Sequence, residues 1–483
     1  MEPLRKRRRV SFGGKQVESA LGAQVYGRRV RALNSSFATW ALARLEAGRA
    51  IAEGARDYLA YAVELEAQFL TAHTDIASFG SGDCGQLAHG TDDDSQMIVS
   101  SPRLVSSLGS KKVTLVACGG LHNVACTASG ECYTWGCNDD GSLGRSGDEQ
   151  FPGLVALPEP VATVAAGATQ SFAVGVGGSP YGWGCYKDRE GKQWFDDVVV
   201  VGKSSSARRK QTSPMKIEGF PGKAVSISCG ASHNAALLDD GRAVTWGIGE
   251  VGQLGRSVRP LKKDGSYDLA AVAADHLAPR VVARHGIISK VVACGANHLL
   301  IATEDQVLTS GLNNYGQLGD GTTVDRDALV EVLRGCCVVG LDGGEFHSLA
   351  LAGDGTLYAW GRADSGQLGL GATATSAVGA HVDSPTAIAG VALALDDRFR
   401  AIACGDNHNL ALTKKGVLYS WGYGEMCQLG TGKSKDETKP AKVDLDKASL
   451  GAGGGGGGGG APVVTHVSAG GQHSILVAAA ASF

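Results

Sequence analysis

The sequence predicts an all-β protein, a seven-bladed β-propeller closed by sharing one blade between both ends of the chain. The main observation is a phrase of the form x-Gly-x-x-His, which occurs seven times, once with glutamine in place of histidine. The last residues of the seven copies are His122, Gln170, His233, His298, His347, His408 and His473. Such a repeat marks a stacked supersecondary unit, because one unit cannot bury its own apolar face.

The two ends of the repeat array carry complementary parts of one unit, which is the second observation. The segment 79–87 has the Phe-Gly and Gln-Leu phrases that end a unit but lacks the opening phrase, whereas the segment 463–477 has the opening phrase alone. A blade built from both termini would leave no open sheet edge.

The strands of one unit can be assigned in the best-defined copy, residues 402–430. Three strands are expected there, with a tight turn at Lys414-Lys415-Gly416, and a fourth is expected at 440–443. The 71 glycines fit a fold made of many short strands joined by tight turns. The recurring histidines are expected to be buried and to bond the backbone of their own blade, rather than to bind metal or act as catalysts.

Charge and cysteine content exclude several classes of protein. The net charge of −3 argues against a globally basic nucleic-acid binder, and no apolar run has the length of a membrane span or follows the basic N-terminus as in a secretory signal. The twelve cysteines contain no C-x-x-C pair. Four of them share one repeat position and are expected to be isolated buried thiols: Cys118, Cys229, Cys294 and Cys404. A reducing compartment is therefore expected, with no metal and no cofactor.

Three parts of the chain are predicted. Residues 1–31 are basic and lack periodicity, which is typical of a disordered tail. Residues 32–72 show apolar residues at helical spacing and form a short helical segment. Residues 73–480 form the propeller, interrupted by a flexible loop of almost pure glycine at 451–460.

The repeat resembles that of the regulator-of-chromosome-condensation family, whose members are seven-bladed propellers. The resemblance covers roughly residues 76–478, and individual blades are similar, in the same order, to those of the family's exchange factor for the small GTPase Ran. The phrases that carry it lie at 135–145, 252–256, 311–315 and 361–371. It implies a guanine nucleotide exchange factor, which forms no covalent bond, so whether the chain counts as an enzyme stays open.

The third blade departs most from the repeat. After Trp183-Gly184 it continues Cys185-Tyr186-Lys187-Asp188-Arg189-Glu190-Gly191-Lys192 in place of a Gln-Leu-Gly turn. In the Ran exchange factor this position carries a β-wedge that enters the GTPase. The resemblance therefore implies a GTPase-binding set made of Asp83 in the first blade with Tyr186, Lys187, Asp188, Arg189, Glu190 and Gly191. An ordinary solvated loop is the alternative interpretation of the wedge.

Three positions differ from the family's GTPase-facing residues. The chain has Ala168, Ser232 and Phe346 where the family has Asp, Asp and His. These differences favour a second hypothesis, a non-catalytic propeller scaffold that binds chromatin or transport proteins. A plant-type photoreceptor propeller would need clustered tryptophans on one face, and it is rejected because five of the seven tryptophans occupy the repeat's Trp-Gly position.

The N-terminal segment resembles the importin-α-binding nuclear-basket nucleoporin (nucleoporin fifty). The matching residues are Leu33, Asn34, Phe37, Trp40 and Tyr58. The resemblance implies that a basic run, Lys6, Arg7, Arg8 and Arg9, binds importin-α, although the same run could contact the phosphates of DNA or associate with histones. The expected location is the nucleus, at the nuclear pore or on chromatin, with Ran and importin-α as partners.

Overall fold

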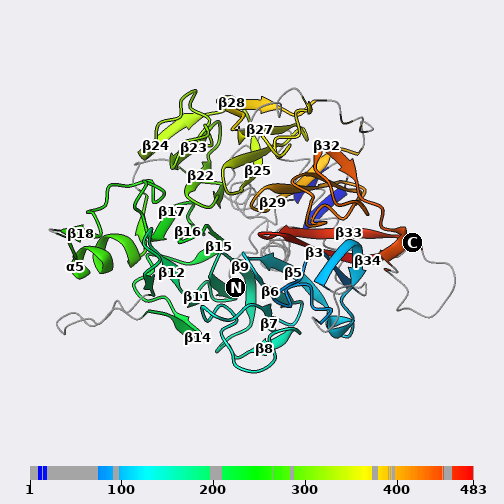
Figure 1. The fold of residues 1–483 in the computed structure, drawn as a ribbon, viewed down its shortest axis with the longest axis horizontal. Coiled ribbons are helices and arrows are strands. Elements are labelled where there is room, and N and C mark those ends of the chain that lie inside the picture. The colour runs from blue at the N-terminus through cyan, green and yellow to red at the C-terminus, as the bar shows by residue number, and fades with distance from the viewer. Residues whose placement is uncertain are drawn as a thin grey trace, which may run out of the picture.

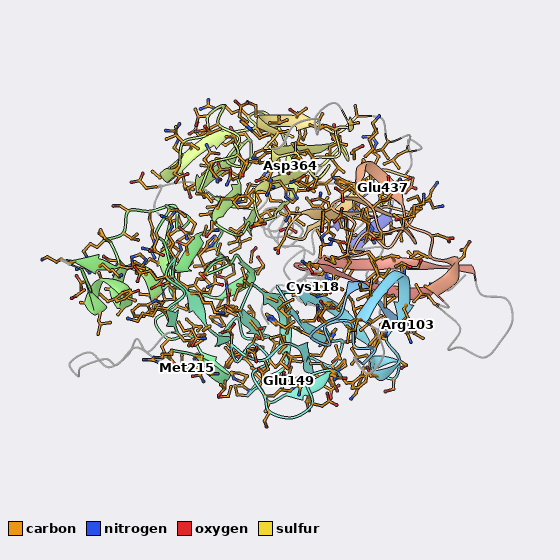
Figure 2. All side chains as sticks on the ribbon, in the orientation of Figure 1. Arg103, Cys118, Glu149, Met215, Asp364 and Glu437 are labelled. Carbon is orange, nitrogen blue, oxygen red and sulfur yellow. The ribbon has the colours of Figure 1, made fainter. Side chains whose placement is uncertain are left out.

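The computed structural model describes residues 9–12, 15–18, 74–90, 97–195, 209–263, 265–282, 288–372, 379–389, 391, 393, 397–448, 450 and 460–481. Seven four-stranded antiparallel sheets are arranged around one axis (Figure 1). The predicted seven-bladed propeller is confirmed. The rim and the centre of the ring are seen in Figure 2, where Cys118 lies near the axis while Arg103 and Met215 lie at the periphery.

Blades two to four follow one another along the chain, each running from the axis outward. Blade two contains β5 (Val113–Cys118), β6 (His122–Thr127), β7 (Cys132–Gly136) and β8 (Gly153–Val155). Blade three contains β9 (Val161–Ala166), β10 (Gln170–Gly175), β11 (Pro180–Gly184) and β14 (Gln211–Lys216). Blade four contains β15 (Ala224–Cys229), β16 (His233–Leu238), β17 (Ala243–Gly247) and β20 (Arg280–Val281).

Blades five to seven repeat this order. Blade five contains β21 (Val291–Cys294), β22 (His298–Ala302), β23 (Val307–Gly311) and β24 (Arg326–Val332). Blade six contains β25 (Val338–Gly343), β26 (His347–Ala352), β27 (Leu357–Arg362) and β28 (His381–Ala387). Blade seven contains β29 (Phe399–Cys404), β30 (His408–Thr413), β31 (Leu418–Gly422) and β32 (Glu437–Lys442).

Blade one is shared between the two ends of the chain, as predicted. Its inner strands are β33 (Gly460–Ala469) and β34 (His473–Ala481), and its outer strands are β3 (Thr74–Ser81) and β4 (Ile98–Leu104). β34 pairs with β3 over seven residue pairs, from Thr74 opposite Ala479 to Gly80 opposite His473. Figure 1 shows the C-terminal strands beside β3.

The remaining described elements are small. Two hairpins project from the blades: β12 (Tyr186–Lys187) with β13 (Gln193–Trp194), and β18 (Lys262–Lys263) with β19 (Ser266–Tyr267). Short helical turns occupy Ser106–Leu108, Leu269–Ala271 (α5), Val272–Leu277 and Asp446–Ala448. Among the described residues, no helix is long and apolar enough to cross a membrane. All twelve cysteines are free thiols.

Part of the predicted disordered tail contains regular structure. β1 (Arg9–Phe12) pairs with β2 (Lys15–Glu18) in an antiparallel hairpin, within the segment that was predicted to be disordered. The predicted helical segment 32–72 lies outside the described residues.

The second strand of each blade lies in the core between neighbouring sheets. All six residues of β6, β10, β16, β26 and β30 are buried. The repeat tryptophans, Trp135, Trp183, Trp246, Trp360 and Trp421, have at most 1% of their surface exposed. These indoles are therefore core residues, as the Trp-Gly position predicted.

The prediction that each histidine bonds its own blade is wrong, because the histidines bond the next blade. His347 of blade six has Nε2 2.7 Å from Asn409 Oδ1 of blade seven. The Asn409 amide nitrogen donates to the Gln367 carbonyl at 2.7 Å, so its oxygen must accept and His347 must donate through Nε2. Trp421 donates to the same carbonyl at 3.1 Å.

This network recurs around the ring. The histidine links join His122 to Ser171, His298 to Ser348, His408 to Ser474 and His473 to Asn123. Gln170, which replaces the blade-three histidine, still crosses to the next blade by donating to the Gly230 carbonyl at 2.9 Å. The exception is His233, because Leu299 occupies the partner position in blade five. Among the described residues, no side chain of blade five forms a hydrogen bond with the His233 ring.

A second ring of bonds lies closer to the axis and uses backbone alone. At every junction, the residue after the repeat glycine donates its N–H to a carbonyl of the next blade's inner loop, ending with Gly471 donating to Gly119. A Cβ at Gly405 would overlap the carbonyl oxygen of Gly470, and Gly119 meets Gly167 in the same way. The glycine of x-Gly-x-x-His is required because a side chain would hold neighbouring loops apart.

Closure by both ends predicts a severe effect of truncation. Deleting the chain from Val463 onward removes most of β33 and all of β34, and it leaves β3 with an unpaired edge beside two exposed blade faces. We expect an aggregating or poorly folded protein, measured by light scattering and thermal melting. A truncated protein that stays monomeric with unchanged cooperative melting would contradict the shared blade.

The inter-blade histidines predict a loss of stability in acid. Burial lowers the pKa of His347 to about 4, below the roughly 6.5 of an unfolded chain. Neutral His347 therefore contributes fully to the free energy of unfolding above pH 6.5. This contribution, on the order of 1–3 kcal/mol for one histidine, is lost as the pH falls toward 4. We expect His347→Gln, which copies Gln170, to reduce the loss of unfolding free energy between pH 7.5 and pH 5.

Two further variants test whether His347 is responsible for the acid sensitivity. His347→Leu leaves Asn409 Oδ1 without its donor, and it should cost about 1–3 kcal/mol at both pH values. His381→Gln, a change at an exposed histidine, serves as the control. Equal acid sensitivity in His347→Gln and the unmodified protein would show that His347 does not take up the proton that destabilises the fold.

Candidate functional site

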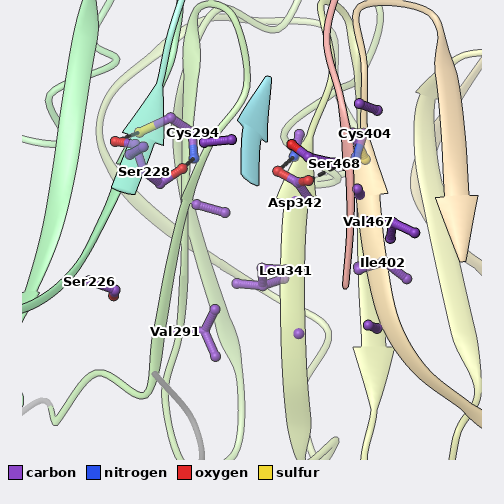
Figure 3. A pocket seen from close by; sticks show the side chains of 18 of the residues that line it. Ser226, Ser228, Val291, Cys294, Leu341, Asp342, Ile402, Cys404, Val467 and Ser468 are labelled. Atoms are coloured by element: carbon purple, nitrogen blue, oxygen red, sulfur yellow. Dashed lines mark hydrogen bonds between the residues drawn. The ribbon is translucent and has the colours of Figure 1, made fainter. Parts of the chain in front are cut away.

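The central channel is one candidate site (Figure 3). It has a volume of about 290 Å³ and is lined by the inner strands of the blades. Its polar side chains are used by the fold. Ser228 Oγ accepts the Cys294 N–H at 2.9 Å, and Ser468 Oγ accepts the Cys118 N–H at 2.9 Å. Asp342 takes the same role toward Cys404 at 2.8 Å.

These bonds each join one blade to the next, so they are further inter-blade links. Burial raises the pKa of Asp342 to about 7 and that of the Cys294 thiol to about 12. The thiol is therefore protonated at neutral pH and a poor nucleophile or metal ligand. The channel is best described as part of the closure of the ring.

The wedge hairpin, residues 186–194, is the second candidate site. It follows β11 of blade three, where the other blades make a Gln-Leu-Gly-type turn. Its base is buried: Tyr186 is 0% and Trp194 1% exposed. Its tip, Arg189-Glu190-Gly191, is exposed. An ordinary solvated loop would not have a base of this kind.

Tyr186 replaces the missing turn in the network between blades three and four. The Trp246 indole donates to the Tyr186 hydroxyl at 3.1 Å, where other repeat tryptophans donate to a backbone carbonyl. The Asn234 amide lies 3.1 Å from the same hydroxyl. Tyr186 thus anchors the hairpin and is not available at the surface.

Asp188 organises the turn of the hairpin. Its Oδ1 accepts the N–H groups of Glu190 and Lys192 at 3.0 and 2.9 Å, while Trp194 Nε1 donates to Oδ2 at 3.0 Å. Burial raises its pKa, but these hydrogen bonds and that of Tyr267 outweigh burial and keep the pKa below its usual value. Asp188 is therefore an ionised structural group at neutral pH.

Lys187 and Ser232 attach the hairpin to the adjacent blades. Lys187 Nζ pairs with Asp140 of blade two at 2.7 Å, and Gln193 Nε2 donates to the other oxygen of Asp140 at 2.8 Å. The Lys187 N–H donates to Ser232 Oγ of blade four at 2.9 Å. Ser232, one of the three departures from the family pattern, thus positions the wedge.

Asp83 lies on the same face as the wedge hairpin. Its exposed carboxylate follows β3, next to Cys84. Burial raises the pKa of Cys84, and the nearby Cys137 thiol and the Asp83 and Asp139 carboxylates raise it further. Because Asp140 pairs with Lys187, the loops of blades one, two and three form one continuous surface. The predicted residues Asp83, Lys187, Arg189 and Glu190 thus lie in the loops of blades one and three, which are joined through the blade-two loop that contains Asp139 and Asp140.

The other two departures also have local partners. Ala168 donates its N–H to the Gly230 carbonyl in the inner ring. Phe346 packs edge-on against Tyr315, with ring centroids 5.1 Å apart, and the Arg362 guanidinium lies 5.8 Å from its centroid. An aromatic and arginine cluster has taken the place of a polar side chain at this point of the face.

The contribution of blade four to this surface was not predicted from the sequence. Its last strand begins only at Arg280, after an insertion of residues 257–279. Lys262 and Tyr267 of this insertion contact the wedge hairpin, and Glu250 Oε2 accepts the Arg189 N–H at 2.9 Å. The unusual length of this blade was the available signal.

The N-terminal predictions cannot be placed on this surface. Lys6, Arg7 and Arg8 lie outside the described residues, and Arg9 begins β1. The nucleoporin-like residues, Leu33, Asn34, Phe37, Trp40 and Tyr58, also lie outside them.

The chain is similar in sequence to several propeller proteins. The regulator of chromosome condensation of Mus musculus is 32% identical over 419 residues, covering 83% of this chain and 90% of the relative. The ultraviolet-B receptor UVR8 of Arabidopsis thaliana is 30% identical over 387 residues, covering 76% and 77%. The guanine nucleotide exchange factor SRM1 of Saccharomyces cerevisiae is 28% identical over 408 residues, covering 76% and 81%.

Solved structures are similar in fold. Prp20p of Saccharomyces cerevisiae, studied with its binding properties to Gsp1p and histones, has a TM-score of 0.71 and 27% identity over 85% of this chain and 93% of its own. A structure of Kap60 bound to yeast RCC1 (Prp20) gives a TM-score of 0.72 and 26% identity over 85% and 90%. The family model described as an RCC1-like domain matches residues 75–476. The chain therefore belongs to the family of RCC1-like domain proteins.

Proposed function

We propose that this chain is a guanine nucleotide exchange factor for a GTPase of the Ran type. The observation that carries the proposal is the wedge hairpin, which presents Arg189 and Glu190 at an exposed tip while its base is built into the junctions of blades two, three and four. Relatives described as a regulator of chromosome condensation and as an exchange factor support it.

The mechanism follows from coupling between two ligands of the GTPase. A GTPase holds its nucleotide through backbone N–H groups, a lysine and Mg²⁺. A protein that binds the nucleotide-free state more tightly must lower nucleotide affinity by the same factor. The Glu190 carboxylate suits competition with phosphate for N–H and lysine groups, whereas Arg189 suits the carboxylates around the metal ion. Asp83 and the blade-two loop supply the adjoining platform.

Rigidity of the hairpin is central to this mechanism. Ordering a free loop on binding would consume part of the binding free energy. Asp188 fixes the turn, and Ser232 and Asp140 fix the base, before any partner arrives. The interaction energy of the tip is therefore available to displace the nucleotide.

A scaffold without exchange activity is the competing function. Ala168 and Phe346 replace polar residues of the family, and Prp20p, one of the structural neighbours, was studied with histones as well as Gsp1p. A photoreceptor role, although UVR8 is a relative, is disfavoured because the tryptophans of the described part are buried in the core.

The N-terminal arm extends the proposal to transport. The basic run Lys6, Arg7, Arg8 and Arg9 would bind importin-α, and the nucleoporin-like segment would bring the propeller to the nuclear pore. The complex of Kap60 with yeast RCC1 supports a transport-related partner for this fold. The same basic run could hold the protein on histones or DNA in the nucleus.

Exchange is tested with Ran carrying a fluorescent guanine nucleotide. Replacing Arg189-Glu190 by Gly-Ser should slow catalysed release about a hundredfold, equivalent to about 2–3 kcal/mol of lost stabilisation, because the tip alone would enter the GTPase. Asp83→Ala should give a smaller loss. Arg242→Ala changes an exposed arginine in the turn between β16 and β17 of blade four, and this variant should release nucleotide as fast as the unmodified protein does. Release no faster than in buffer with the unmodified protein would favour the scaffold.

The tail has its own test. Replacing Lys6, Arg7, Arg8 and Arg9 with alanine should abolish importin-α binding in a pull-down and reduce nuclear accumulation, without changing the propeller's melting temperature. If importin-α binding is unaltered, the run has a phosphate-binding role or none.

A further inference from the structure

The insertion of blade four contacts the wedge hairpin through the hairpin's polar groups. The Tyr267 hydroxyl donates to Asp188 Oδ2 at 2.8 Å and lies 3.2 Å from Glu190 Oε2. Lys262 Nζ pairs with Glu190 Oε1. The hydrogen bonds from these two groups, with the positive charge of Lys262, lower the pKa of Glu190.

Aromatic contacts join the same two segments. The Tyr267 ring packs against Trp194 with centroids 5.0 Å apart. Lys192 Nζ lies 3.4 Å from the Tyr267 centroid and 4.1 Å from that of Trp194. A cation placed between two aromatic faces strengthens the link between hairpin and insertion.

The insertion is itself well anchored to blade four. His276 accepts the Gly249 N–H through Nδ1 at 3.0 Å and donates through Nε2 to the Arg259 carbonyl at 2.7 Å. Val272 and Leu277 belong to the same buried cluster as Tyr186 and Trp194. The insertion is therefore a fixed support for the wedge hairpin that it contacts.

Space remains between the tip and blade four. A cavity of about 330 Å³ there is lined by Asp188, Glu190, Glu250, Lys262 and Tyr267, among others. The tip is thus held by bridging side chains more than by close packing beneath it. A hairpin with two residues in each strand is too short to fix its own orientation.

We propose that Tyr267 and Lys262 are positioning residues, which hold the wedge tip in the orientation needed for nucleotide exchange. The expected effect of these two residues on nucleotide exchange rests on the proposed exchange function. Their effect on the orientation of the hairpin can be measured without a GTPase. Loss of the brace would let the tip sample other orientations, and ordering it would then oppose binding.

The bracing is measured by trypsin, which cleaves after Arg189 at the exposed tip. In Tyr267→Phe with Lys262→Met, the ring and the aliphatic stem remain while the polar links to Asp188 and Glu190 are lost. We expect cleavage after Arg189 to accelerate about tenfold, since cleavage follows the population of the opened hairpin. The single variant Lys262→Arg, which retains Tyr267 and a cation at position 262, should be cleaved after Arg189 as slowly as the unmodified protein.

The activity arm uses Ran with a fluorescent nucleotide. The double variant should lose about tenfold in kcat/KM at an unchanged melting temperature, and Lys262→Arg alone should keep the native value. Tyr423→Phe with Lys111→Met is the matched control, since Tyr423 bonds Glu425 in blade seven and Lys111 pairs with Glu131 away from the wedge.

The outcomes separate the two proposals. Slow cleavage in the double variant, equal to that of the unmodified protein, would overturn the bracing. Fast cleavage with unchanged exchange would overturn the positioning role. If the unmodified protein fails to catalyse release while the double variant is cleaved faster, the exchange function fails and the positioning role fails with it, but the brace stands as a structural contact.

Discussion

Close approach of neighbouring inner loops is the constraint on which this propeller depends. In six of the seven blades, a Cβ on the repeat glycine would overlap a backbone carbonyl of the next blade, as between Gly405 and Gly470. The resulting N–H to carbonyl bonds form a closed circle of seven junctions. Because the circle closes through the C-terminal strands, no blade can be removed without leaving two unsatisfied loops and two exposed sheet faces.

The side-chain bonds between blades explain why three phrases recur together in the repeat: x-Gly-x-x-His, Trp-Gly and the Gln-Leu-Gly turn. The histidine and the turn carbonyl of one blade meet the tryptophan of the next blade, as His298 and Gln317 of blade five meet Trp360 of blade six around Ser348. The junction requires an acceptor at that point, not a particular turn. Blade three could therefore replace its turn with a hairpin, because the Tyr186 hydroxyl supplies the acceptor.

The repeat pattern was sufficient to predict the blades, the shared first blade and the buried tryptophans, since each follows from periodicity within one unit. It was insufficient to predict the partner of each histidine, because a repeat gives the position of a residue and not which neighbour it faces. The contacts of Lys262 and Tyr267 with the wedge were also missed. They join segments more than seventy residues apart, and the insertion that carries them has no counterpart in other blades.

Two of the departures from the family pattern, Ser232 and Phe346, make specific contacts in the structure. A serine at position 232 accepts a bond from the wedge backbone, and its short side chain suits a hairpin drawn close to blade four. Phe346, with Tyr315 and Arg362, forms a cluster of the residue types that dominate protein interfaces. On the proposed binding face, these residues put a held hairpin and an aromatic patch in place of dispersed polar contacts. A partner surface matched to this face would need acidic groups near Arg189 and an apolar contact over blades five and six.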